Sequence, residues 1–156
     1  MTTMQPSREF HLDRSTHDDL IEHARSDVPY EVCGLLAGAG GRLTAHYRIP
    51  NAARSMTFYN MDPTAMLAAM NEMDDNDWDL LGIYHSHTHT EAYPSSTDIE
   101  LAFYADAVYL IVSLQDPQDP HIRAFDIVDG EVRERTLVID GERSATDPAA
   151  PTAGNM

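Results

Sequence analysis

The sequence predicts an α/β (α+β) fold in which a single mixed β-sheet is flanked by helices. Strand-type and helix-type segments alternate along the chain in the order β-α-β-β-α-β-α-β-β-β. Glycine-rich or Asp-Gly segments join two pairs of consecutive strands, as expected for antiparallel hairpins. The length of 156 residues fits one domain with a core of its own, and the sequence contains no internal repeats.

The N-terminal segment combines a short strand with an amphipathic helix. Residues 10–12 have the composition of a strand, and Ser15 is the expected N-cap of the following helix. Apolar residues then recur at helical spacing to about Asp27. Because proline cannot continue a helix, Pro29 marks its end.

Two strands of a hairpin are expected next. Residues 32–37 form a compact apolar run, whereas residues 42–49 alternate between polar and apolar side chains. The intervening Gly-Ala-Gly-Gly at residues 38–41 suits a tight turn. Residues 50–60 show no periodicity, and we expect an irregular segment there.

A second helix precedes the most apolar strand of the first half. Asp62 followed by Pro63 is typical of an N-cap and the first helical position. Small and flexible apolar side chains then recur at helical spacing as far as Asp77: Ala65, Met66, Ala69, Met70 and Met73. This stripe favours core packing over a ligand surface. Residues 78–87 are expected to form a strand.

The remaining segments are predicted to complete the sheet. Residues 88–94 form a loop that leads into a helix over residues 95–105. Three further strands are expected at residues 107–114, 121–128 and 131–139. Asp129-Gly130 joins the last two as a hairpin turn. Residues 141–156 are rich in Ala, Pro, Thr and Gly, and they predict a disordered tail.

Composition excludes several classes of function. The formal charge of −16 opposes binding to nucleic acid, because the phosphates would be repelled. No apolar run approaches the length of a membrane span, and the polar N-terminus has no signal-peptide pattern. The single cysteine, Cys33, permits no internal disulfide, so we expect a cytoplasmic protein. The acidic surface is read as a source of solubility, although it also permits a partner with a basic face.

The most informative residues are His85, His87 and Asp98. Side chains two apart on a strand point the same way, so both imidazoles can reach one ion at the strand end. Asp98 would lie in the first turn of the next helix. Two imidazoles, one carboxylate and a water are a typical ligand set for catalytic zinc. The alternatives are an exposed strand end for the histidines and a helix-capping role for Asp98 under Ser95.

The residues around this set resemble the JAMM (MPN+) zinc metalloprotease family. The resemblance rests on a glutamate before an apolar strand (Glu31 to Leu36), on His-Ser-His at residues 85–87, and on Ser95-x-x-Asp98. It covers residues 8–140 and implies the cytidine-deaminase-like MPN fold. It also implies that His85, His87 and Asp98 bind Zn²⁺ and that Glu31 is the general acid/base. Ser95 would hydrogen-bond the water or the oxyanion. Spacing alone does not locate Glu31 among the acids of the chain.

Further segments resemble a bacterial subgroup of that family. They are the stretch from Asn51 to Tyr59, Ile83 to Thr88, Thr90 to Ser95 and Ile127 to Gly130. That subgroup releases cysteine from the C-terminal Gly-Gly of a small ubiquitin-like sulfur-carrier protein. The resemblance therefore implies such a carrier as the partner and a role in cysteine biosynthesis. A peptidase acting on another ubiquitin-like conjugate or carrier precursor, and a non-catalytic MPN scaffold, are the alternative readings.

Five further side chains have open roles. His89 extends the alternation of histidines and permits a three-histidine zinc site in place of Asp98, although an exposed loop residue is the preferred reading. Cys33, within an apolar strand, is expected to be inert core. Aromatic side chains are candidates for a groove that receives the carrier tail as an added edge strand: Phe58, Tyr59 and Tyr93. The oligomeric state is not encoded in any of these patterns.

Overall fold

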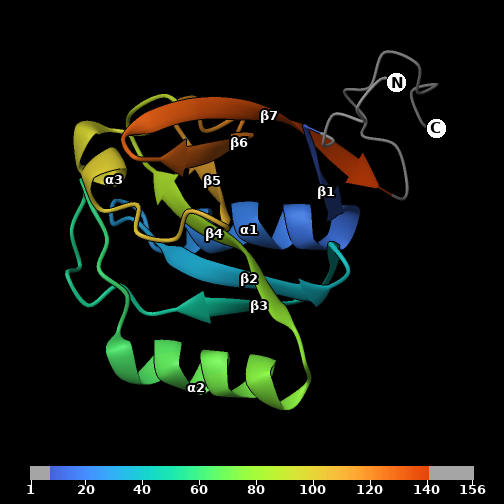
Figure 1. Cartoon of the computed structure of the whole chain (residues 1–156). Coiled ribbons are helices and arrows are strands. Elements are labelled where there is room, and N and C mark those ends of the chain that lie inside the picture. The colour runs from blue at the N-terminus through green and yellow to red at the C-terminus, as the bar shows by residue number, and fades with distance from the viewer. Residues whose placement is uncertain (1–7, 141–156) are drawn as a thin grey trace, which may run out of the picture.

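The computed structural model describes residues 8–140, which form one seven-stranded mixed sheet with helices packed on it (Figure 1). The strands are β1 (Glu9–Asp13), β2 (Cys33–Ala39), β3 (Arg42–Ile49), β4 (Asp79–His87), β5 (Val108–Ser113), β6 (His121–Val128) and β7 (Glu131–Asp140). The helices are α1 (Arg14–Ser26), α2 (Pro63–Asp75) and α3 (Ser96–Glu100). The predicted order of elements and the mixed sheet are confirmed. The tail predicted at residues 141–156 lies outside the described residues.

The sheet order is β1-β7-β6-β5-β4-β2-β3. β4 pairs in parallel with β5, and β1 in parallel with β7, whereas the other neighbours are antiparallel. Both predicted hairpins are present. Gly40, Gly41, Asp129 and Gly130 at their turns adopt positive φ angles, which glycine tolerates and which match two-residue hairpin turns. β4 therefore lies between β2 and β5 in the centre of the sheet.

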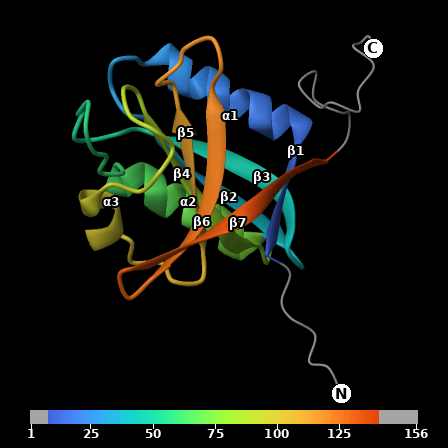
Figure 2. The same ribbon diagram turned by 90° about the horizontal axis from the view of Figure 1, so that it is seen from above.

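Two apolar clusters lie on opposite faces of this sheet, each under one helix (Figure 2). Leu20 and Ala24 of α1 pack with one face, and Ala69 and Met73 of α2 pack with the other. Strand β5 serves both clusters because its side chains alternate between the faces. A strand covered on both sides reads as an uninterrupted apolar run, as the sequence of β5 does.

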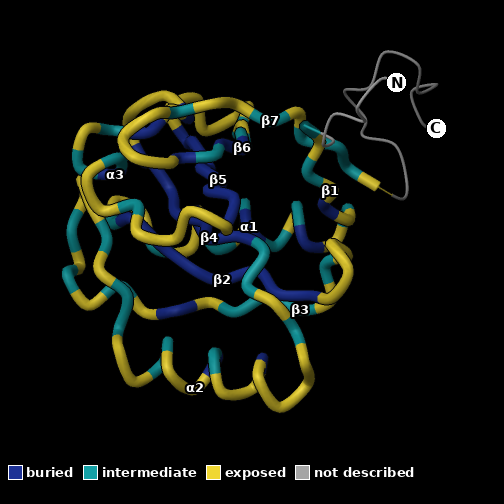
Figure 3. The backbone as a smooth tube through the Cα atoms, in the orientation of Figure 1, coloured by how far each residue is buried: buried dark blue, intermediate teal, exposed yellow. Residues whose placement is uncertain are grey.

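Burial is concentrated in the central strands (Figure 3). All six residues of β5 and the last six of β4 are buried, whereas β7 and the outer side of α2 are largely exposed. The C-terminal end of β4 is thus enclosed by protein, although it carries two histidines and a serine. Among the described residues, no helix has the length and hydropathy that crossing a membrane requires.

The start of α1 differs from the sequence prediction. Asp13, rather than Ser15, is the N-cap: its carboxylate accepts hydrogen bonds from the Thr16 backbone N–H (3.1 Å) and the Thr16 hydroxyl (2.8 Å). Ser15 lies inside the first turn and donates its hydroxyl to Asp13 (2.6 Å). A carboxylate can accept several bonds at once, which explains why Asp13 takes this position.

The helix predicted over residues 95–105 is also wrong in its length, because α3 ends at Glu100. The amide of Tyr104 donates to the hydroxyl of Tyr109 (3.1 Å) rather than to a carbonyl one turn earlier. A tertiary contact thus replaces a helical hydrogen bond at this point. By contrast, α2 begins as predicted, with the Asp62 carboxylate accepting from the Ala65 N–H (2.9 Å) and with proline in the first turn.

Candidate active site

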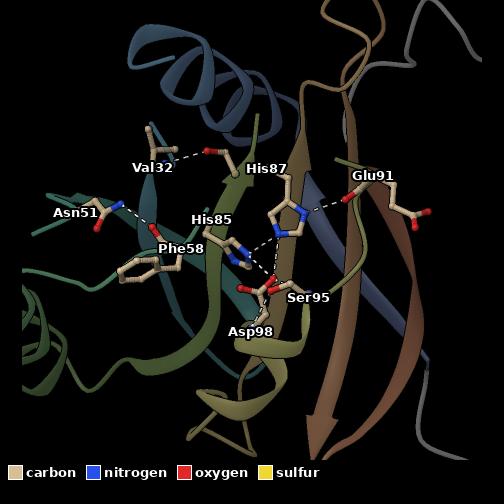
Figure 4. A network of polar contacts seen from close by, with 9 residues as sticks. Val32, Asn51, Phe58, His85, His87, Glu91, Ser95 and Asp98 are labelled. Carbon is tan, nitrogen blue, oxygen red and sulfur yellow. Dashed lines mark hydrogen bonds and ion pairs between the residues drawn. The ribbon is translucent and has the colours of Figure 1, made fainter. Parts of the chain in front are cut away.

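The two histidines of β4 lie on the same face of the sheet and are almost fully buried. Their Nε2 atoms are 3.2 Å apart, so both rings point toward one place, as the alternation of strand side chains requires (Figure 4). His85 pairs with Cys33 of β2 and with Ile111 of β5. The ring of Tyr59 stacks on His85, with centroids 4.6 Å apart and planes 28° apart. Neighbours on three sides thus fix the orientation of His85.

Asp98 completes a group of three from the other side (Figure 4). Its Oδ2 lies 2.9 Å from Nε2 of His87 and 3.1 Å from Nε2 of His85. Asp98 is also the third residue of α3 and forms a capping box with Ser95: the Ser95 N–H donates to Asp98 Oδ2 (2.9 Å), and Ser95 Oγ accepts from the Asp98 N–H (3.0 Å). The capping role and the meeting with the histidines are therefore compatible.

The chemistry of this donor set fits a divalent metal ion. The three ligand atoms lie within 4.8 Å of one another, and all three residues are buried. Nδ1 of His87 lies 2.8 Å from the backbone oxygen of Glu91 and can donate to it, which leaves Nε2 with its lone pair for coordination. Such a hydrogen bond behind a ligating imidazole is usual in metal sites. A backbone acceptor of this kind has no signature in the sequence.

The protonation states of His85 and Asp98 agree with this use. Burial lowers the pKa of His85, so its imidazole is held neutral, and Asp98 opposes this effect only in part. Burial alone would raise the pKa of Asp98, but hydrogen bonds from His85 and His87 outweigh it and hold the pKa well below the usual range of a carboxyl group. A neutral imidazole and an ionised carboxylate are the forms that bind a cation. Burial alone would lower the pKa of His87, but its hydrogen bonds to Asp98 and to the Glu91 backbone outweigh burial and raise the pKa, so a cation that binds there displaces a proton.

Glu31 lies beside this group. The antiparallel pairing of β2 with β4 starts at Cys33 and His85, and the Ser86 N–H donates to the Val32 carbonyl just before it (3.0 Å), which brings Glu31 close to His87. It is 3% exposed, and its Oε1 has no hydrogen-bond partner among the described residues. Burial raises the pKa of Glu31 to about 8; the charge of His87 lowers it and that of Asp98 raises it. A carboxyl with such a pKa can both take and release a proton near neutrality.

Neither His89 nor Cys33 belongs to the three-residue group found in the described chain. His89 is exposed and contacts Thr88 Oγ1 through Nδ1 (2.9 Å), and the metal-binding group found in the described residues does not include it. Cys33 is buried with its Sγ directed at the Ile49 carbonyl (3.3 Å). Burial raises the pKa of this thiol to about 12, with a smaller contribution from Glu31, which leaves it unreactive.

A comparison with known families identifies the domain. The sequence family described as prokaryotic homologs of the JAB domain matches this chain over residues 13–128. The chain belongs to the JAB/MPN family. The resemblance seen in the sequence is thereby confirmed, and so is the JAB/MPN α/β fold.

Relatives of this JAB/MPN domain include named peptidases. The CysO-cysteine peptidase of Mycobacterium tuberculosis is 48% identical over 120 residues, which cover 76% of this chain and 82% of the relative. A desampylase of Haloferax volcanii is 32% identical over 136 residues, covering 83% and 95%. A solution structure from Desulfitobacterium hafniense matches with a TM-score of 0.76 and 35% identity, covering 87% of this chain and 96% of that one. The protein is a hydrolase that acts on peptide bonds.

Proposed function

We propose that this JAB/MPN peptidase hydrolyses the amide between the C-terminal Gly-Gly of a ubiquitin-like sulfur-carrier protein and cysteine, with release of cysteine for biosynthesis. The observation that carries the proposal is the convergence of His85, His87 and Asp98 beside the buried Glu31. The similarity to a CysO-cysteine peptidase over most of both chains supports the substrate. The catalytic domain would comprise residues 8–140, and the buried single cysteine suits the cytoplasm.

Zinc is the proposed metal, because two imidazoles and one carboxylate suit it and leave a fourth position for water. His85, His87 and Asp98 would hold it. When bound there, zinc supplies Lewis-acid polarisation of a carbonyl and increases the acidity of a water molecule. The hydrogen bond from His87 to the Glu91 carbonyl and the capping contact of Asp98 with Ser95 keep two of the donors oriented.

Glu31 and Ser95 carry the proposed proton transfer and charge stabilisation. Glu31 takes a proton from the attacking water and passes it to the leaving amine of cysteine, and its burial beside the three-residue group places it for both steps. Ser95 Oγ accepts from the Asp98 N–H, so its own O–H proton remains available for donation. That proton can stabilise the negative charge that develops on the carbonyl oxygen of the substrate.

The carrier tail is proposed to lie along aromatic residues beside the metal group. Tyr59 contacts His85 directly, and Phe58 and Tyr93 keep 40% and 42% of their surfaces exposed. Tyr59 also lines an apolar pocket of about 250 Å³ together with Ile83, Tyr104 and other residues. An extended Gly-Gly segment could reach the scissile position along this wall, because it carries no side chains that would obstruct it.

A second candidate substrate is a conjugate between a ubiquitin-like protein and another protein. The match to a desampylase, which covers 95% of that relative, favours this class. A non-catalytic scaffold has no need for three buried ligand-type groups and a buried glutamate in register with them. The two proposed peptidase activities differ in the group that leaves, which is cysteine or a second protein. They use the same residues of the site in the same way.

Mass spectrometry separates these substrates. The purified protein, loaded with zinc, is incubated with a sulfur carrier that ends in Gly-Gly-Cys and, in parallel, with a carrier joined to a lysine of a second protein. We expect the first adduct to lose the mass of one cysteine residue, and a chelator to prevent that loss. Cleavage of the lysine conjugate alone would refute the proposed substrate in favour of the second candidate.

A further inference from the structure

The base proposed for the reaction lies outside the regular sheet. β2 begins at Cys33, so the backbone of Glu31 takes no part in its ladder. Two contacts with the segment 51–61 hold it instead: the Glu31 N–H donates to the Ser55 carbonyl (2.9 Å), and the Glu31 carbonyl accepts from Asn51 Nδ2 (3.0 Å). Because Glu31 Oε1 has no hydrogen-bond partner in the described chain, its position depends on this backbone anchoring and on packing.

The amide of Asn51 has all four of its hydrogen-bonding positions in use. Nδ2 donates to the carbonyls of Glu31 and Phe58 (3.0 and 3.2 Å), and Oδ1 accepts from the N–H groups of Ala53 and Asn60 (3.0 and 2.9 Å). Only an amide side chain of this length offers two donors and two acceptors together. Asn51 follows β3 directly, and its backbone forms an isolated bridge with Met61, so the amide itself starts from a fixed position.

The same side chain also fixes Tyr59. The residues before and after it, Phe58 and Asn60, are both bonded to Asn51 (Figure 4 shows the contact with Phe58). The ring of Tyr59 stacks on the proposed metal ligand His85. One amide therefore connects the backbone of the proposed base with the aromatic wall beside the proposed metal ligands, and its four hydrogen bonds in the described chain all go to backbone groups rather than to those ligands.

We propose that Asn51 is a positioning residue for the peptidase reaction, which holds Glu31 and Tyr59 in register with each other across the site. This inference rests on the proposed function only in that Glu31 is taken as the base. Misplacement of a reacting group by about 1 Å can cost about 100-fold in rate. Loss of the Asn51 contacts should therefore slow turnover while the ligands of the metal stay in place.

Asn51→Asp tests the proposal most directly. The aspartate keeps the acceptors for Ala53 and Asn60 but places a carboxylate oxygen against the carbonyls of Glu31 and Phe58. We expect kcat to fall about 10- to 100-fold, KM to change less than about threefold and zinc to remain at one ion per chain. Asn76→Asp is the matched control, because Asn76 Nδ2 also donates to a backbone carbonyl, that of Glu72 (2.9 Å), at the distant end of α2. Its kcat should stay at the wild-type value.

Amide hydrogen exchange gives a readout independent of activity. In Asn51→Asp the N–H of Glu31 should exchange about tenfold faster or more, because the Glu31 carbonyl loses its donor, while amides of β5 keep their protection. Asn51→Ser is the second variant if the aspartate prevents folding, since a serine hydroxyl can still accept from the N–H two residues on but does not reach Glu31.

Three outcomes would overturn the positioning role. The first is unchanged exchange at Glu31, the second is loss of zinc in parallel with kcat, and the third is a change confined to KM. The rates are measured on whichever of the two carrier conjugates the wild type cleaves. Failure of the wild type on the cysteine adduct therefore counts against the proposed substrate, whereas the exchange and zinc measurements decide the role of Asn51 in either case.

Discussion

Individual residues of the site have separable tasks, which substitutions should reveal. Asp98 and the histidines meet at one point, whereas Glu31 faces that point without sharing a hydrogen bond with them. Glu31→Gln keeps the size of the side chain and removes its ability to carry a proton. We expect this variant to bind zinc at the wild-type ratio and to lose about 100- to 10,000-fold in kcat.

Asp98→Ala is the complementary variant, because it removes one of the three donor groups. It should lose zinc as well as activity, and metal analysis after gel filtration measures both variants side by side. His89→Ala is the control, since His89 is exposed and lies outside the ligand group. Zinc loss in His89→Ala with zinc retained in Asp98→Ala would replace the proposed ligands, and full turnover by Glu31→Gln would remove the base.

Some residues of the site can be identified from the sequence pattern, and others cannot. The His-x-His pair and Asp98 are visible because alternation on a strand and a following helix start bring them together. Glu31 is not visible in that way, because the pairing of β2 with β4 joins segments that are far apart in the sequence. Only the family resemblance located it. Asn51 belongs to a quoted motif, but nothing in its spacing indicates contacts with Glu31 and Phe58.

At the level of elements, periodicity predicted every strand and helix in its correct order, and the errors lie at helix ends. Helix ends depend on side-chain acceptors and tertiary contacts, which periodicity does not report. The Tyr109 hydroxyl that accepts from Tyr104 is one such contact, and the Asp13 carboxylate is another. The second of these can be tested by its effect on stability.

The cap of α1 predicts different losses of stability for substitutions at Asp13 and at Ser15. Asp13→Ala removes the acceptor for the Thr16 N–H and hydroxyl, so the free energy of unfolding should fall by about 1 kcal/mol. Ser15→Ala leaves that acceptor in place and should cost clearly less. Urea denaturation at pH 7 measures both. A larger loss for Ser15→Ala would restore serine as the cap.

For the molecule as a whole, the two faces of the sheet have different roles. One face carries the candidate active site, and the other carries a structural contact between α1 and the sheet. The candidate metal-binding group lies on the face that α2 covers, because Tyr59, which stacks on His85, packs there with Cys33. The face under α1 carries Tyr84, whose hydroxyl lies 2.7 Å from Nδ1 of His23, with the two rings edge to face. The pairing of His23 with Tyr84 connects α1 to the centre of the sheet, on the face opposite the proposed ligands.

His23 should make global stability depend on pH. Burial lowers its pKa from 6.5 to about 4; nearby Arg48 and His46 also lower it, and Asp19 and Asp27 oppose them. Because the folded-state pKa lies below that of the unfolded chain, the unfolded chain binds the proton first as the pH falls. The stabilisation is complete above about pH 6.5 and is lost as the pH falls toward 4, by about 1–2 kcal/mol because solvent screens this partly exposed group.

His23→Gln removes this titration and keeps a polar side chain that can bond to Tyr84. Its free energy of unfolding should therefore fall less steeply between pH 7 and pH 4.5 than that of the wild type, by about 1–2 kcal/mol over the interval. His121→Gln is the control, because that side chain is 65% exposed and the carboxylates common to all three proteins cancel in the comparison. Equal slopes for wild type and His23→Gln would show that His23 does not couple protonation to folding.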